Sequence, residues 1–450
     1  MAGNASVRNP ELDAEIKEMK PDHRSKHRID SVELFKRLLK DNRDVLSYPE
    51  QLQVYYQKNN YKTTLINRFL WTDDLQYLIA DLEDAGSHGL DPELFLTSKL
   101  RKRSTNLNTY ENEVVLELLT ANALLKYSVA MQFGLLDPYS LDSNYFTTTV
   151  HADSTFLMQV LEVRTLKKYL DSIQPKSKAY FALQEALKSE TPVNGKTLKE
   201  TQSILAVNLE RLRWKNKPAE QKYVVVNIPD FSLDVMDNGK SILHMKVCVG
   251  EAGDWETPQL NSKIYTVQVN PVWNIPESIA KNETIRNAAN DRYYLSNSNI
   301  EVYRKGKLVG NVESIDWETG NLSEYSFKQL PGEQNALGKI KFLFNNKSSV
   351  YLHDTPVKSA FKRAERAISH GCIRVESPLK LAFALFGKGP KYDDIKRAMA
   401  SGYPRAKYIG LPIAVPVVIT YFTAFADDKG QIKFCKDVYG KDKEMMRAKM

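Results

Sequence analysis

The spacing of hydrophobic residues changes about halfway along the chain. Up to Trp214, apolar residues recur three and four positions apart, as they do on one face of a helix. One such set is Leu75, Leu78, Ile79 and Leu82. Segment 111–133 is apolar on more than one face, which is typical of a helix surrounded by other helices, and Gly134 is expected to end it. This part of the chain therefore predicts a mainly α-helical domain.

Local signals suggest where individual helices begin and end. Thr72 is expected to cap the helix that contains Leu75, and Gly86 to end it. Asp91 followed by Pro92 is typical of another helix start. Further helices are predicted at 32–39, 176–188 and 197–214. Residues 1–30 are polar and show little periodicity, so we interpret them as a flexible lead-in before a helical domain at 31–219.

After residue 220 the pattern becomes typical of β-structure. Short runs rich in β-branched and aromatic residues alternate with turn residues, which predicts a second, mostly β domain at 220–440 and a tail at 441–450. The predicted strands are 223–228, 232–236, 244–249, 264–270, 339–344, 350–352 and 415–424. One helix is expected within this domain, opened by Ser377 and Pro378 and closed by Gly387. The chain after residue 427 is expected to add one short strand at most.

Segment 273–329 interrupts the predicted strands. It is rich in asparagine and aromatic residues and lacks the regular alternation of the flanking segments. Insertions of this length between strands of a compact domain are usually functional. We therefore predict that it forms a lid over a binding site.

Composition and charge add limits. The chain has 450 residues, is 42% hydrophobic and carries a net charge of +8, which is typical of a folded globular protein with a mildly basic surface. Because no basic run interleaved with aromatics accompanies this charge, a nucleic-acid partner is not expected. No run of 18 apolar residues and no apolar leader after Met1 is found, so the sequence as given predicts neither a membrane span nor a signal peptide. A chain from which a leader has been removed would show the same pattern.

The three cysteines lie far apart, which disfavours a disulfide framework and a cysteine-rich metal site. Cys248 and Cys435 are predicted to be inert small hydrophobes, although a bond between them remains open at this point. Cys372 differs because His370 and Gly371 precede it directly and His353 lies upstream. A thiol nucleophile needs such a base, and a glycine turn can direct amide groups towards an oxyanion. The pattern therefore predicts cysteine-dependent acyl transfer.

The same residues carry a resemblance. The segment SHGCIRV at 369–375, with YLHDTP at 351–356, resembles the active-site signature of L,D-transpeptidases that have a YkuD-type catalytic domain. Further pieces are similar, in order, to the long Gram-negative members, which also have a helical scaffold domain. They are ELLTANALLKY at 117–127, YVVVNIPDFSLDV at 223–235, Thr257 with Pro258, NPVWNIP at 270–276 and NALGKIKF at 335–342.

The resemblance implies an α+β protein: a helical scaffold domain and a YkuD-like catalytic domain with a capping subdomain at 273–329. It implies a periplasmic enzyme that needs no cofactor or metal and forms 3→3 cross-links between peptidoglycan stem peptides, one acting as donor and one as acceptor. Carbapenems are implied as inhibitors.

The resemblance also assigns roles to single residues. Cys372 would be the nucleophile, His353 the general base and acid, and the amides of Gly371 and Cys372 the oxyanion donors. The substrate path would be lined by Arg374, Tyr351, Trp273, His370 and Ser369.

Several alternatives stay open. An L,D-carboxypeptidase or amidase would resolve the same thioester with water, and a wall-binding protein would keep the fold without catalysis. Arg374 could pair with Glu376 at the surface, and Trp273 could belong to a local core. His353, His370 and Cys372 could be zinc ligands, but no clear fourth ligand accompanies them. Besides a second stem peptide, a free D-amino acid or a wall-attached protein stays open as the acceptor, and no oligomeric state is predicted.

Overall fold

The computed structural model of the protein describes residues 21–448 apart from residues 71, 194, 319–321 and 428. The chain forms two compact units. The first comprises the described residues up to Leu135 together with Val150–Lys215, and the second comprises Leu136–Thr149 with the chain from Asn216 onward. Segment 136–149, which the sequence pattern placed in the helical domain, belongs to the second unit because its strand β1 (Tyr145–Phe146) pairs with β5 (Gln259–Val269).

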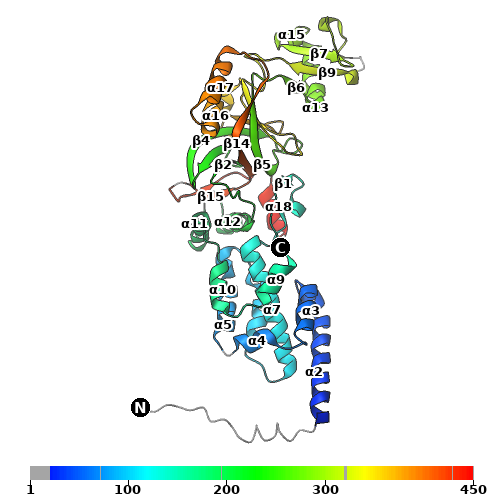
Figure 1. Cartoon of the computed structure of the whole chain (residues 1–450), viewed down its shortest axis with the longest axis vertical. Helices are drawn as coiled ribbons and strands as arrows, with labels where there is room; N and C mark the ends of the chain where they lie inside the picture. Colours follow the sequence, from blue (N-terminus) through cyan, green and yellow to red (C-terminus); the bar gives the residue numbers. More distant parts are fainter. Residues whose placement is uncertain (1–20, 71, 194, 319–321, 428, 449–450) are drawn as a thin grey trace. The chain divides into compact units, whose positions relative to one another are not determined.

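The first unit is helical, as predicted. Helices α2, α4, α6, α9 and α10 pack around α7, and Figure 1 shows α4, α9 and α10 beside it. The helices are α2 (Pro21–Asp41), α3 (Pro49–Lys58), α4 (Thr64–Phe69), α5 (Asp74–Glu83), α6 (Thr97–Ser104), α7 (Tyr110–Phe133), α9 (Ser154–Leu161), α10 (Leu166–Ile173), α11 (Lys178–Lys188) and α12 (Leu198–Arg213).

Helix α7 is the core of this unit. Its N-terminus is capped by Thr109, whose side chain accepts the amide N–H of Asn112, and Gly134 at φ 83° ends it. By length and composition α7 could cross a membrane, but 83% of its most apolar window is buried inside the unit. Its apolar character is thus explained by helix packing.

Some predicted helix ends differ from those observed. The N-cap of α5 is Asp73, and Thr72 only accepts the amide of Asp74 at 3.4 Å. The helix passes into a 3-10 turn, η2 (Asp84–His88), and the left-handed residue that ends it is Gly89 instead of Gly86. Of the predicted lead-in, residues 1–20 lie outside the described residues, whereas 21–30 form the first turns of α2.

The second unit is built on a β-sheet that closes on itself. Its strand order is β5-β10-β11-β13-β4-β3-β2-β14, and β14 also pairs with β5. Strand β12 (Ala367–Ser369) pairs with β4. The other strands are β2 (Lys222–Asn227), β3 (Ser232–Asp237), β4 (Lys240–Gly250), β10 (Ile340–Phe344), β11 (Leu352–His353), β13 (Ile373–Val375) and β14 (Lys407–Thr420). The prediction of a helical domain followed by a mostly β domain is confirmed.

Alternate residues of these strands form the core inside the sheet. Val224, Val247, Val267 and Phe342 are each 0% exposed, as expected for positions two apart in a strand with one buried face. Helices α16 (Pro378–Phe386) and α17 (Pro390–Ser401) pack against the sheet and lie beside β4 and β14 in Figure 1.

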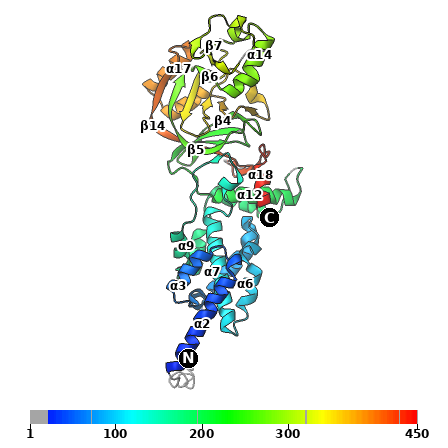
Figure 2. The same cartoon turned by 90° about the vertical axis from the view of Figure 1, so that its right-hand side faces the viewer.

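Segment 273–329 folds as a small subdomain, which we call the insertion. Its sheet has the order β6-β9-β7-β8, and a separate core surrounds Val302 and Phe327. Figure 2 shows β6, β7 and α14 grouped together. Its elements are β6 (Trp273–Ile275), α13 (Glu277–Ile279), the π-helical turn η4 (Ala280–Thr284), α14 (Ile285–Asn290), α15 (Tyr294–Asn297), β7 (Ile300–Arg304), β8 (Lys307–Leu308) and β9 (Tyr325–Gln329).

The C-terminal segment supports the loop between β4 and β5. After the hairpin of β15 (Ala424–Ala426) and β16 (Ile432–Phe434), Tyr439 donates its hydroxyl to the carbonyl of Gly250 at 2.7 Å and accepts the amide of Thr257 at 3.2 Å. Helix α18 (Lys441–Ala448) occupies the predicted tail, of which residues 449–450 lie outside the described part of the chain. Lys441 pairs with Asp142 at 3.0 Å, on the segment that contains α8 (Pro138–Leu141).

Candidate active site

Two neighbouring strands orient the candidate residues. Strands β11 and β13 run parallel, with Leu352 opposite Ile373 and His353 opposite Arg374. Leu352 and Ile373 are fully buried in the core of the sheet. Because successive side chains of a strand point to opposite faces, His353 and Arg374 lie together on the other face.

Three more residues join this face. Tyr351 and Cys372 each stand two positions before His353 and Arg374, and the rings of Tyr351 and His353 lie 5.7 Å apart. On the next strand, β10, Lys341 pairs with His353, and its Nζ lies 5.4 Å from the centroid of the Tyr351 ring. We call this set the thiol face. It consists of Lys341, Tyr351, His353, Cys372 and Arg374.

His353 is buried, and its Nδ1 lies 2.6 Å from the backbone carbonyl oxygen of Asp354. A carbonyl can only accept, so Nδ1 carries the proton and Nε2 has a free lone pair. Burial, followed by the charge of Arg374, lowers the pKa of His353 to about 4. The imidazole is therefore neutral and able to accept a proton at neutral pH. Within the described part of the chain, no hydrogen bond joins His353 to Cys372.

Burial also determines the protonation state of the Cys372 thiol. Burial raises its pKa, while hydrogen bonding from the amide and side chain of Tyr351 and the charges of Lys341 and Arg374 oppose the rise. With a raised thiol pKa and a lowered imidazole pKa, the free site holds a neutral thiol and a neutral imidazole. It does not hold a preformed thiolate–imidazolium pair.

The loop before Cys372 is held by side-chain hydroxyls. Gly371 has a φ of +100°, a conformation that L side chains rarely adopt. The Thr257 hydroxyl donates to the carbonyl of Gly371 at 2.8 Å, and the Ser369 hydroxyl donates to the carbonyl of Cys372 at 2.6 Å. Since C=O and N–H of a trans peptide point in opposite directions, the Cys372 amide points away from Thr257. Among the described residues, neither the Gly371 nor the Cys372 amide has an acceptor.

Asp354 fixes the chain directly after His353. Its buried carboxylate accepts the amide of Lys339 at 2.9 Å and pairs with the Lys358 ammonium at 2.5 Å. A Cβ at Gly338, which has a φ of +60°, would lie only 2.4 Å from this carboxylate. The segments 335–342 and 351–356, both part of the family resemblance, thus pack against each other at Gly338, where only glycine fits.

His370 faces the insertion. Its Nε2 lies 2.6 Å from a carboxylate oxygen of Glu283 in η4, and its ring meets that of Trp255 edge-on at a centroid distance of 4.7 Å. Trp273 packs against the insertion core from β6. The structure therefore places His370 and Trp273 at the insertion, and Tyr351, His353, Cys372 and Arg374 on the thiol face.

Sequence reasoning missed three residues that contact or approach this site. Lys341 reaches it through the pairing of β10 with β11, Thr257 through a long-range hydrogen bond, and Glu283 from the insertion. For Lys341, the alternation of polar and apolar residues in 339–344 was an available signal. For Thr257, the resemblance included the residue but gave it no role, and for Glu283 no sequence signal is evident.

The other cysteines lie elsewhere. Cys248 is buried against Ala360 and Phe361, and the Cys435 sulfur lies 3.6 Å from a carboxylate oxygen of Asp230. All three cysteines are free, so a Cys248–Cys435 bond is not formed. In the part of the chain that the structure describes, no group of three or more His, Cys, Asp or Glu side chains could hold a metal ion.

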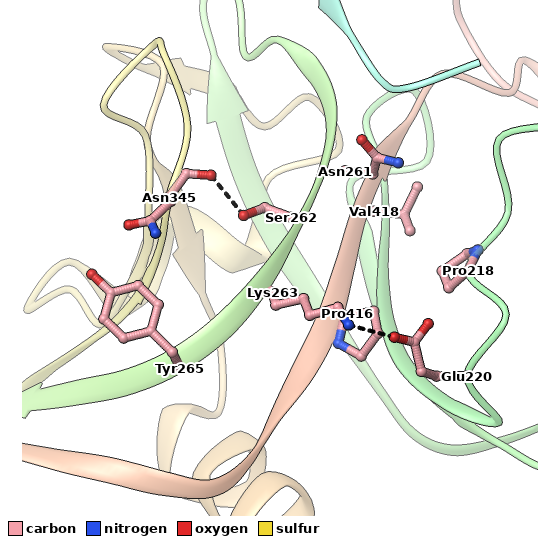
Figure 3. A pocket seen from close by; sticks show the side chains of 9 residues that line it. All are labelled: Pro218, Glu220, Asn261, Ser262, Lys263, Tyr265, Asn345, Pro416 and Val418. Carbon is pink, nitrogen blue, oxygen red and sulfur yellow. Dashed lines mark hydrogen bonds and ion pairs between the residues drawn. The ribbon is translucent and has the colours of Figure 1, made fainter. Parts of the chain in front are cut away.

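A hollow of about 500 Å³ lies on strands β5 and β14, apart from the thiol face (Figure 3). Lys263 pairs there with Glu220 at 2.7 Å, and the Ser262 hydroxyl donates to the Asn345 carbonyl at 2.6 Å. The lining residues are Pro218, Glu220, Asn261, Ser262, Lys263, Tyr265, Asn345, Pro416 and Val418. Because this set contains no cysteine or histidine, the hollow is not a candidate for thiol chemistry.

Several solved structures align with parts of the chain at 12% identity. The alignment with the carbamoyl enzyme that Ldtfm forms with avibactam covers 45% of this chain and 49% of that enzyme's chain, with a TM-score of 0.20. An L,D-transpeptidase from Mycobacterium smegmatis covers 44% of this chain and 58% of its own, also at 0.20. The alignment with L,D-transpeptidase 1 of Mycobacterium tuberculosis covers 44% of this chain and 61% of that chain, with a TM-score of 0.16.

Sequence comparisons are more specific. The L,D-transpeptidase catalytic domain (YkuD) matches residues 221–385, and the scaffold domain matches residues 50–187. A Haemophilus influenzae protein named "Putative L,D-transpeptidase" is 33% identical over 249 residues, which are 55% of this chain and 49% of that protein. The chain thus spans about half the length of this curated relative. The two matched domains together cover more than half of the chain, which therefore has an L,D-transpeptidase catalytic domain (YkuD) and a scaffold domain.

Proposed function

We propose that the protein is a peptidoglycan L,D-transpeptidase that forms 3→3 cross-links through a thioester on Cys372. The observation that carries the proposal is the thiol face, where Cys372 stands beside a buried, neutral His353 and two amides without acceptors. The match of residues 221–385 to the L,D-transpeptidase catalytic domain supports the reaction class.

The donor is a stem tetrapeptide. The Cys372 sulfur attacks the carbonyl carbon of its third residue, a diaminopimelate, while Nε2 of His353 takes the thiol proton. The oxyanion is stabilised by the amides of Gly371 and Cys372. When the tetrahedral intermediate collapses, the C–N bond to the terminal D-Ala breaks, and His353 returns the proton to the leaving amine.

The acceptor amine completes the cycle. His353 takes a proton from the side-chain amine of a diaminopimelate on a neighbouring stem, and this amine attacks the thioester carbonyl. The C–S bond then breaks, His353 gives its proton to the sulfur so that the Cys372 thiol is restored, and the 3→3 amide is formed. A His353 that is neutral at rest suits both proton abstractions, because its lowered pKa keeps Nε2 free at neutral pH.

Roles for the surrounding residues follow. Arg374 and Tyr351 are proposed to contact the donor from the thiol face, and Trp273 from the insertion. Ser369 acts through the Cys372 carbonyl and His370 through Glu283, so we propose that both position the loop at 369–372. The same thiol is proposed to react with carbapenems, and the enzyme is proposed to work in the periplasm, where its substrate lies.

Incubation with purified disaccharide-tetrapeptide, read by mass spectrometry, tests the reaction. A cross-linked dimer and free D-Ala support transpeptidation. Tripeptide without dimer indicates an L,D-carboxypeptidase, and unchanged substrate indicates a wall-binding protein without catalysis.

A further inference from the structure

Lys341 is a half-buried lysine on the thiol face with no assigned role. Its position on β10 is fixed by two partners, because Lys341 pairs with His353 on one side and with Gln268 of β5 on the other. Its ammonium lies 5.4 Å from the centroid of the Tyr351 ring, which places the charge beside the residue that hydrogen-bonds the thiol.

No acidic residue in the described part of the chain balances the charge of Lys341. Within the described residues, neither Lys341 nor Arg374 has a carboxylate within ion-pair distance, including the nearby Glu376. The Cys372 thiol feels the positive charges of both Lys341 and Arg374. Burial lowers the pKa of Lys341, since a partly desolvated ammonium without an anion is unfavourable. Two cations without partners beside a nucleophile are typical of a site built for an anionic ligand.

We propose that Lys341 is a substrate-binding residue that holds a carboxylate of the donor stem peptide beside Cys372. This inference rests on the proposed function. The donor offers two carboxylates near the bond that breaks, one on the diaminopimelate side chain and one at the terminal D-Ala. Both groups are carboxylates that a cation can bind. Lys341 binds one of them, and Arg374 remains available for the other.

Binding measurements on the full chain test this without catalysis. In a Cys372→Ser background, calorimetry compares three ligands: the tetrapeptide, its diaminopimelate carboxamide and its D-Ala carboxamide. Lys341→Met should weaken binding of the unmodified tetrapeptide roughly 10- to 100-fold, the range for a lost charge-assisted hydrogen bond. The effect should vanish with the one analogue that lacks the recognised carboxylate, which also identifies that carboxylate.

Two variants control for fold and for net charge. Lys347→Met removes an exposed lysine from the turn after the same strand and should leave all three affinities unchanged. Lys341→Arg keeps a cation and should retain the discrimination between acid and amide, even if Lys341→Met proves unstable.

Loss of affinity by the same factor for all three ligands would refute the proposal, as would an unchanged affinity in Lys341→Met or no binding of the tetrapeptide at all. Failure of the proposed function has a different signature. The Cys372→Ser protein would still distinguish acid from amide through Lys341, while the unaltered protein would release no D-Ala.

Discussion

Thr257 offers a sharp test of how the nucleophile loop is held. Its hydroxyl accepts the amide of Gly250 and donates to the carbonyl of Gly371, both at 2.8 Å, and the residue is only 2% exposed. Thr257→Val keeps the shape of the side chain but leaves a buried donor and a buried acceptor without partners. Each unsatisfied group costs about 1–3 kcal/mol. We therefore expect the free energy of unfolding to fall by about 2 kcal/mol or more.

The kinetic effect should be larger than a simple loss of stability explains. Removing an oxyanion donor outright lowers kcat by roughly 100- to 1000-fold in other enzymes. Thr257→Val leaves the Cys372 amide in place but frees the carbonyl that orients it. We therefore expect kcat for D-Ala release to fall by about 10- to 100-fold with little change in KM.

Two comparisons isolate this mechanism. Thr257→Ser keeps the hydroxyl and should retain most of the kcat. Alkylation of Cys372 by iodoacetamide forms no oxyanion, so its rate should be nearly the same in Thr257→Val. The account is wrong if folded Thr257→Val keeps its kcat within about twofold, or if Thr257→Ser loses as much as Thr257→Val.

Three further predictions concern packing and protonation. Gly338→Ala should destabilise the protein by about 2 kcal/mol or more, because its Cβ would lie 2.4 Å from the Asp354 carboxylate; melting temperatures should fall for this variant and not for Gly310→Ala, which has open space. The pH midpoint for alkylation of Cys372 should lie above the ordinary value of about 8.5, since burial raises its pKa, and a midpoint near 6 would contradict the neutral resting pair. Burial lowers the pKa of His88 in the first unit to about 4. Below about pH 6.5 the unfolded chain binds a proton at this histidine before the folded protein does, so the free energy of unfolding falls by at most roughly 3 kcal/mol as the pH approaches 4. His88→Gln should show a shallower fall of melting temperature over this range, and an unchanged slope would count against the assignment.

Several strands and helices could be predicted from local patterns in the sequence. Alternation located β2 and β3 to within a residue, and the serine, proline and glycine signals located α16. Helix α17 was missed because only Ile395 and Ala398 are buried in it, which leaves little apolar periodicity. Strand β14 starts eight residues before the predicted run at 415, and its early part is mostly exposed, so the hydrophobic pattern does not reveal it.

Long-range strand pairing is the part of the fold and of the candidate site that could not be predicted from the sequence. Closure of the sheet depends on β14 pairing with β5, which no local pattern encodes. The candidate site divides in the same way. Cys372, Gly371 and His353 lie in two short motifs within 351–375 and were found. Lys341 approaches the thiol face through the pairing of β10 with β11, and Thr257 holds the Gly371 carbonyl from the loop before β5. No local pattern encodes either contact.

The central claim is that Cys372 carries the acyl group. The most direct measurement is the intact mass of the protein after brief mixing with disaccharide-tetrapeptide and an acid quench. We predict a mass increase equal to the donor minus D-Ala, present in Cys248→Ala and Cys435→Ala and absent from Cys372→Ala. An adduct that persists in Cys372→Ala, or cross-linked product formed by that variant, would contradict the account.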